Sequence, residues 1–190
     1  MLKNDPSAGD SLTLYDLICG LLLQSGNDCA AAIAEHISGS QEAFAELMNT
    51  EAKQLGATGT HFVNPHGLHD ENHYTTTYDL YLMFNEALKD QAFLDIISMN
   101  SYTAKVTSAD GTSYTPTWQA TNYYSAGEAT PPDGIHVYGG KTGTTDQAGN
   151  CVILYEKNTA GEPYISVIMG ASDKPLLYEE MNELLDAGMK

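Results

Sequence analysis

The spacing of hydrophobic residues changes midway along the chain, and this change limits most strongly the folds that the sequence can adopt. Before about residue 99, apolar side chains recur every three or four positions, which is typical of amphipathic helices. After Asn100 they alternate with polar residues, which indicates strands, until a last helical stretch begins at Leu176. Helices followed by consecutive antiparallel strands predict an α+β fold, with a helical cluster packed on an antiparallel sheet and a C-terminal helix on one face.

Helices in the first half are predicted from capping residues as well as from apolar spacing. Thr13 with Asp16, and Thr76 with Asp79, form the Thr-x-x-Asp pattern that caps a helix N-terminus. Glycines mark several of the C-terminal ends. The expected helices lie at residues 13–24, 28–37, 40–56, 76–88 and 91–98, with a long loop at residues 57–75.

Strands in the second half are joined by short turns. Residues 101–108 alternate like a strand, Asp110-Gly111 is a hairpin signal, and residues 113–124 follow it. Three consecutive antiparallel strands and an amphipathic helix are then expected at residues 135–143, 148–158, 163–171 and 176–189.

A chain of this length is expected to hold one domain, residues 1–190. It contains no repeat and no obvious linker, and 42% hydrophobic residues are enough for a buried core. Within the domain we expect a helical lobe at residues 11–98 and a sheet lobe with the terminal helix at residues 99–190.

Acidic residues dominate the charge. The chain has 25 acidic residues against eight lysines and no arginine, which gives a formal net charge of −17. This charge argues against binding to nucleic acid or to anionic lipid, because both need a basic surface. The most apolar stretch, residues 17–23, is too short to span a bilayer, which takes about 20 residues.

The three cysteines, Cys19, Cys29 and Cys151, lack the spacing of metal ligands. Each lies among apolar or small residues, which favours buried, reduced thiols. A disulfide between Cys19 and Cys29 is the alternative.

Two short motifs carry the chemical signal. Lys141 stands within Gly-Gly-Lys-Thr-Gly-Thr-Thr, where small neighbours would let a ligand come close to the backbone. Ser25-Gly26-Asn27 lies in the break between two predicted helices. Each motif is ordinary by itself. In this order, and more than a hundred residues apart, they match the Ser-x-Asn and Lys-Thr-Gly motifs of penicillin-binding proteins and β-lactamases.

From about Ser11 onward the chain resembles the D-alanyl-D-alanine carboxypeptidases, the low-molecular-weight penicillin-binding proteins. The resemblance rests on residues 12–40, 44–80 and 138–154, which hold both motifs. It implies a DD-peptidase/β-lactamase-like fold and a serine-type enzyme that trims peptidoglycan stem peptides ending in D-Ala-D-Ala through an acyl-enzyme. It also implies no cofactor, a location outside the cytoplasm in the cell envelope, and β-lactam binding by the full-length enzyme.

The resemblance further implies the roles of the catalytic residues. Ser25 would relay protons between the nucleophile, the lysines and the leaving amine. Asn27 would hold the peptide carbonyl of the substrate or the neighbouring lysine. Lys141 would supply positive charge close to Ser25 and to the terminal carboxylate of the substrate.

Substrate binding would involve Lys141 and the three residues that follow it. Thr142 would offer a hydroxyl to the carboxylate. Gly143 would let the peptide lie along the strand edge without an obstructing side chain. The backbone N–H of Thr144 would be one of two oxyanion donors.

The family's nucleophile motif, Ser-x-x-Lys, does not occur in this sequence. Only Thr50-x-x-Lys53 comes near it, and that pair follows Ser-Gly-Asn instead of preceding it. We therefore expect that the chain is the C-terminal portion of a longer enzyme, that the N-terminal part of the fold is missing, and that the chain is inactive alone. An exposed groove and sheet edge would then favour self-association.

Relatives often carry a basic residue near the last strand and helix, and this chain offers Lys174 at most. Because lysine lacks the bidentate fork of arginine, recognition of a carboxylate would depend on Lys141 and on threonine hydroxyls.

Two other functions compete with this interpretation. A non-catalytic peptidoglycan-binding module would use the same groove without turnover. A metallohydrolase would use the histidines between residues 61 and 73, although no His-Glu-x-x-His occurs. The competing view of these histidines is a rigid structural loop, residues 64–68, beside the site. The histidines concerned are His61, His66, His69 and His73.

Overall fold

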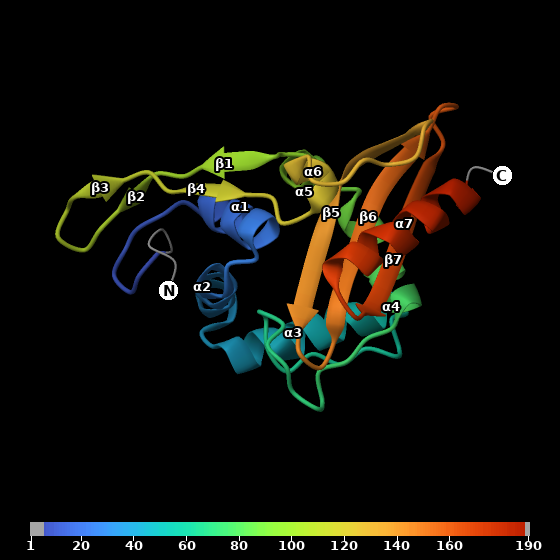
Figure 1. Cartoon of the computed structure of the whole chain (residues 1–190). Coiled ribbons are helices and arrows are strands. Elements are labelled where there is room, and N and C mark those ends of the chain that lie inside the picture. Colours follow the sequence, from blue (N-terminus) through green and yellow to red (C-terminus); the bar gives the residue numbers. More distant parts are fainter. Residues whose placement is uncertain (1–5, 189–190) are drawn as a thin grey trace.

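A three-stranded antiparallel sheet forms the centre of this computed structural model, which describes residues 6–188 (Figure 1). Its strands are β5 (Ile135–Thr145), β6 (Gly149–Asn158) and β7 (Pro163–Ala171), in the order β5-β6-β7. Consecutive strands pair through short turns, as the sequence predicts. Within residues 6–188 the outer edges of β5 and β7 pair with no further strand.

Helices cover both faces of this sheet because its strands are apolar on both faces. On β6, Val152 and Leu154 point into one cluster with helix α7 (Lys174–Gly188), while Ile153 points to the other side. There it meets Phe84 and Ile97, which come from α4 (Thr77–Ala87) and α5 (Gln91–Ile97). Because apolar side chains on β6 alternate between the two faces, α7 packs on one face of the sheet and α4 and α5 pack on the other (Figure 1).

The remaining helices lie beside the β5 edge of the sheet or cross its lower end (Figure 1). Thr13, Ser40 and Thr76 cap their helices through side-chain oxygens, as expected from the sequence. A second core joins Cys19 and Leu23 to Trp118. The bounds are α1 (Leu14–Gln24), α2 (Asn27–Ser38), α3 (Gln41–Gln54) and the short α6 (Tyr123–Ala126).

The prediction of one continuous strand at residues 101–108 is wrong. The chain forms two short two-stranded ladders instead, interrupted where buried Ala104 donates its N–H to the carbonyl of Pro116. Because proline has no N–H, it cannot continue the ladder at this point. The ladders consist of β1 (Ser101–Thr103) with β4 (Thr117–Gln119), and of β2 (Val106–Thr107) with β3 (Ser113–Tyr114).

The long loop between α3 and α4 is held in place by polar side chains. Buried Asp79 accepts hydrogen bonds from the Gly59 N–H (2.8 Å) and the Thr60 hydroxyl (2.7 Å). Asn49 bonds both the N–H and the carbonyl of Phe62, each at 2.7 Å. The loop is therefore ordered by specific contacts and forms a fixed wall.

Two sequence predictions concern covalent and membrane features. Within residues 6–188 the cysteines form no disulfide, so the Cys19–Cys29 alternative is wrong, and both of these thiols are buried. None of the helices in the same range is long and apolar enough to cross a membrane.

Candidate active site

Lys141 and Ser25 meet in space although 116 residues separate them in the sequence. The Lys141 ammonium group donates hydrogen bonds to the Ser25 hydroxyl (2.8 Å) and to the carbonyl of Thr142 (2.7 Å). Lys141 comes from the middle of β5, and Ser25 ends α1. The two motifs therefore converge, as the sequence predicts.

Ser25 holds an unusual backbone conformation. Its φ of 60° and ψ of 41° place it in the left-handed region, and among residues 6–188 no other non-glycine residue has a positive φ. Its N–H bonds to the carbonyl of Gly20 and ends α1, and α2 starts two residues later at Asn27. The tight turn presents Ser25 and Asn27 on one side, at a conformational cost of about 1–2 kcal/mol.

This cost can be measured by comparing two substitutions. Ser25→Gly and Ser25→Ala both remove the hydroxyl that accepts from Lys141, but only glycine adopts the left-handed region without strain. We expect Ser25→Gly to be more stable than Ser25→Ala by about 1 kcal/mol in urea unfolding. Equal stability of the two variants would show that the turn is not strained.

A cleft of about 560 Å³ contains every site residue predicted from the sequence. Its walls are the Ser25–Asn27 turn, the β5 strand from Lys141 to Thr145, and the loop residues 64–68. The chemical roles of these residues stay predictions. The predicted site residues on its lining are Ser25, Asn27, Lys141, Thr142, Gly143 and Thr144.

The outer edge of β5 is available to a ligand. Gly143 is exposed, and a Cβ added there would find no heavy atom within 4 Å. The Thr142 hydroxyl shares a hydrogen bond with Thr121 at 2.6 Å, and when Thr121 is the donor the O–H of Thr142 is left to donate to a ligand. An extended peptide could therefore lie along this edge.

The charge of the cleft is opposite to that of the chain. Lys141 and Lys174 line it, whereas no aspartate or glutamate does, although acidic residues outnumber lysines threefold overall. Desolvation lowers the pKa of Lys141 to about 8. The cleft is therefore suited to an anionic ligand, and Lys141 is able to exchange a proton near neutral pH.

The histidines of the loop are engaged with the backbone. The Nδ1 atoms of His66 and His73 lie 3.2 Å from the N–H groups of Leu68 and Val63, and burial lowers the pKa of both imidazoles. Within residues 6–188, no group of three or more His, Cys, Asp and Glu side chains is placed to hold a metal ion. The contacts of His66 and His73 are those of a structural loop beside the site.

Several lining residues were not predicted as part of the site. Met48 reaches the cleft from α3, Phe62 from the long loop, and Thr121 from the segment before α6. No motif marks them, because their position depends on how distant elements pack together. Lys174 was the only basic candidate near the last strand, and it does line the cleft.

A family model described as D-alanyl-D-alanine carboxypeptidase, Peptidase_S11, matches residues 5–173. DacF of Bacillus subtilis (strain 168) is 31% identical over 178 residues, which are 94% of this chain and 43% of that protein. The carboxypeptidase of Streptomyces sp. (strain K15) is 30% identical over 200 residues, 99% of this chain and 66% of its own length. The chain thus spans less than half the length of DacF.

Solved structures agree with these sequence matches. The crystal structure of the Streptomyces K15 DD-transpeptidase superposes with a TM-score of 0.87 at 28% identity, over 98% of this chain and 71% of that one. The D-alanyl-D-alanine carboxypeptidase from Mycobacterium tuberculosis H37Rv gives a TM-score of 0.78 at 27% identity, over 93% of this chain and 64% of that one.

Proposed function

The chain belongs to the D-alanyl-D-alanine carboxypeptidase family of serine peptidases, and we propose that its cleft binds peptidoglycan stem peptides ending in D-Ala-D-Ala. The activity proposed for the whole enzyme is removal of the terminal D-Ala through an acyl-enzyme, outside the cytoplasm. The observation that carries the proposal is the hydrogen bond of 2.8 Å from Lys141 to Ser25 beside the open edge of β5.

The ligand would be oriented by charge and by strand pairing. Its terminal carboxylate would lie toward Lys141 and Lys174, with the Thr142 hydroxyl as a further donor. Its backbone would extend along β5 past Gly143, where no side chain obstructs it. The Thr144 N–H would then be aimed at the carbonyl under attack.

Proton transfer would be the task of Ser25 and Lys141. With its pKa lowered to about 8, the Lys141 ammonium group can give up a proton through the Ser25 hydroxyl to a leaving amine. Asn27 would hold the peptide carbonyl on the other side of the turn. Acylation itself needs a Ser-x-x-Lys serine, which these 190 residues do not contain.

We propose that this chain binds the ligand without forming an acyl-enzyme, and treatment with a penicillin tests whether a covalent adduct forms. We expect intact-mass measurements on the isolated chain to show no penicilloyl adduct, while the Streptomyces K15 enzyme, treated in parallel, serves as the positive control. An adduct on this chain would reveal a nucleophile other than the one that the family motif supplies.

Binding of a carboxylate ligand should depend on pH through Lys141. The ligand requires the charged ammonium form, and the lowered pKa means that this form is lost as pH rises through about 8. We expect the affinity for N-acetyl-D-Ala-D-Ala to be constant below that pH and then to fall by up to about tenfold per pH unit. Calorimetric titration from pH 6 to 10 measures this.

The control is Lys141→Met, which should bind weakly with no step near pH 8. A step that persists in Lys141→Met would assign the titration to another group.

A further inference from the structure

One carboxyl group is buried beneath helix α7 and has no part in the candidate site. Glu156 lies on β6 and is only 1% exposed. Since side chains alternate along a strand, Glu156 points to the same face as Val152 and Leu154, which pack against α7. A glutamate in such an apolar layer is uncommon, because burial makes its charged form costly.

The two oxygens of Glu156 have different surroundings. Oε1 accepts a hydrogen bond of 2.6 Å from the hydroxyl of Ser166 on β7. Oε2 is buried and has no hydrogen-bond partner among residues 6–188. A carboxylate can accept several hydrogen bonds through its two oxygens, so one donor does not replace the water that the charged form loses on burial. The neutral carboxyl group loses much less.

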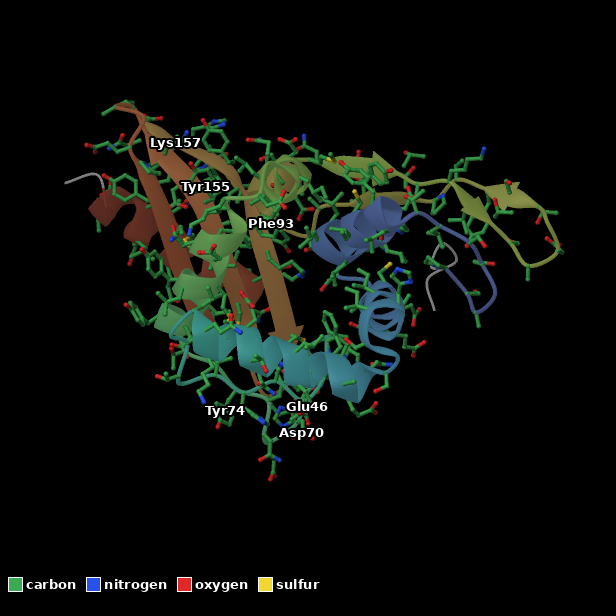
Figure 2. All side chains as sticks on the ribbon, turned by 180° about the vertical axis from the view of Figure 1, so that it is seen from behind. Glu46, Asp70, Tyr74, Phe93, Tyr155 and Lys157 are labelled. Carbon is green, nitrogen blue, oxygen red and sulfur yellow. The ribbon has the colours of Figure 1, made fainter. Side chains whose placement is uncertain are left out.

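No cation compensates for a charge on Glu156. None of the ion pairs found among residues 6–188 involves it. Lys157 is the next residue, but it lies on the opposite face of the sheet, where its ammonium group is 5.1 Å from the ring centre of Tyr138 and 5.8 Å from that of Tyr155. Figure 2 shows Lys157 and Tyr155 close together at this end of the sheet.

The titratable side chains on the neighbouring elements are tyrosines. Tyr164 lies opposite Glu156 on β7, whereas β5 places Val137 there, which does not titrate. Tyr124 of α6 is near enough for Glu156 to affect its pKa, and Tyr178 of α7 packs on Tyr124 with ring centroids 5.3 Å apart. Desolvation raises the pKa of all three tyrosines, so they stay neutral where a carboxyl group titrates. The charged residues of α7 are exposed: Lys174, Glu179, Glu180, Glu183 and Asp186.

We propose that Glu156 is a pH-sensitive switch that controls how firmly α7 packs on the sheet. The neutral carboxyl group fits between β6 and α7 and keeps its hydrogen bond with Ser166. Loss of its proton to the solvent leaves a buried carboxylate with a single donor, and movement of α7 away from the sheet admits water to it. The switch lies outside the cleft and does not depend on the proposed function.

The pKa of Glu156 gives the pH range in which the switch acts. Burial raises this pKa from its ordinary value of 4.5 to about 7, although the hydrogen bond from Ser166 partly offsets the rise. A raised folded-state pKa means that the stabilisation of the packed helix is fully present below pH 4.5 and is lost as pH rises through about 7. Across this range, each pH unit should favour the opened form by up to about tenfold.

Hydrogen exchange of the α7 amides between about pH 5 and 8 tests the switch. Protection factors correct for the intrinsic pH dependence of exchange, and in the wild type they should fall by at least about tenfold over this range. Glu156→Gln has nearly the same shape but no charge, so its protection factors should stay nearly constant. Glu183→Gln, on the exposed face of the same helix, should behave as the wild type does.

Ser166→Ala should change the titration in the opposite direction. Without its one donor the buried carboxylate is less stable, so the pKa of Glu156 should rise further and the loss of protection at high pH should be larger. The ¹³C chemical shift of the Glu156 carboxyl group measures this titration directly in the wild type and in Ser166→Ala. The proposal therefore stays testable if Glu156→Gln does not fold.

The outcomes decide for or against the switch. A carboxyl titration centred near pH 7, with protection of α7 that is lost in the wild type and kept in Glu156→Gln, supports it. A titration centred near the ordinary value of 4.5, protection of α7 that does not depend on pH, or an equal loss in the wild type and Glu156→Gln overturns it.

Discussion

Gly140→Ala is expected to destabilise the protein by about 3 kcal/mol or more, whereas Gly143→Ala on the same strand should leave its stability nearly unchanged. A Cβ at residue 140 would lie 2.0 Å from the carbonyl oxygen of Ile153 on β6, so the two strands would have to separate. A Cβ at residue 143 meets nothing within 4 Å. Urea unfolding of both variants measures this difference.

Gly143→Ala should instead weaken ligand binding. In Gly143→Ala the new methyl group would project into the space proposed for the ligand, so we expect at least about tenfold weaker binding of N-acetyl-D-Ala-D-Ala. The wild type is the reference protein for binding. Binding by Gly143→Ala at wild-type affinity would show that the ligand does not follow this edge. A fully stable Gly140→Ala would contradict the pairing of β5 with β6.

The second large effect is expected at Asp16, which joins α1 to the β1 strand. Asp16 is only 5% exposed and accepts hydrogen bonds from the Tyr102 hydroxyl (2.8 Å) and from both the N–H and the hydroxyl of Thr13. Asp16→Ala would leave these donors without their acceptor. We expect a loss of about 3 kcal/mol, measured by urea unfolding.

The contribution of Asp16 to the free energy of unfolding should also depend on pH, which provides a control for the substitution. Burial alone would raise the pKa of Asp16, but hydrogen bonds from Thr13 and Tyr102 outweigh it and lower the pKa. A lowered folded-state pKa means that the stabilisation is present above the unfolded-state value and is lost as pH falls through the folded-state value. Neither asparagine nor alanine titrates in this range, so Asp16→Asn and Asp16→Ala should both abolish this loss. A cost below 1 kcal/mol for Asp16→Ala at pH 7 would contradict the role of Asp16.

Local signals were sufficient to predict the regular elements. The capping threonines and the apolar spacing predict α1 and α4, and alternation with short turns predicts the three-stranded sheet. The family fold is confirmed by the structural match to the Streptomyces K15 enzyme. The residues that determine these helices and strands lie within them or directly beside them in the sequence, so no knowledge of the tertiary fold is needed to predict them.

Features that depend on distant packing were not predictable in the same way. The strand at residues 101–108 breaks where Ala104, buried beside Trp118, lies opposite Pro116, and alternation within that segment alone does not reveal this pairing. The place of Thr121 in the cleft likewise requires the helices to be positioned first. The lobes at residues 11–98 and 99–190, and self-association through the open groove and sheet edge, stay predictions.

The candidate site could be predicted from the sequence only in part. Lys141 and Ser25 were identified because two motifs occur together in the right order, and the structure places their side chains 2.8 Å apart. The lowered pKa of Lys141 follows from desolvation, which sequence cannot give. Sequence thus identified the chemical groups, and the fold determines their environment.

The most direct test of the cleft is a titration of ¹⁵N-labelled protein with N-acetyl-D-Ala-D-Ala, followed by amide chemical shifts, with the L-Ala-L-Ala isomer as the control. We expect saturable shifts at Ser25, Asn27 and residues 141–145 with the D isomer, and much weaker ones with the L isomer. Absence of shifts at these residues, or identical shifts with both isomers, would contradict a D-Ala-D-Ala site between the Ser25 turn and β5.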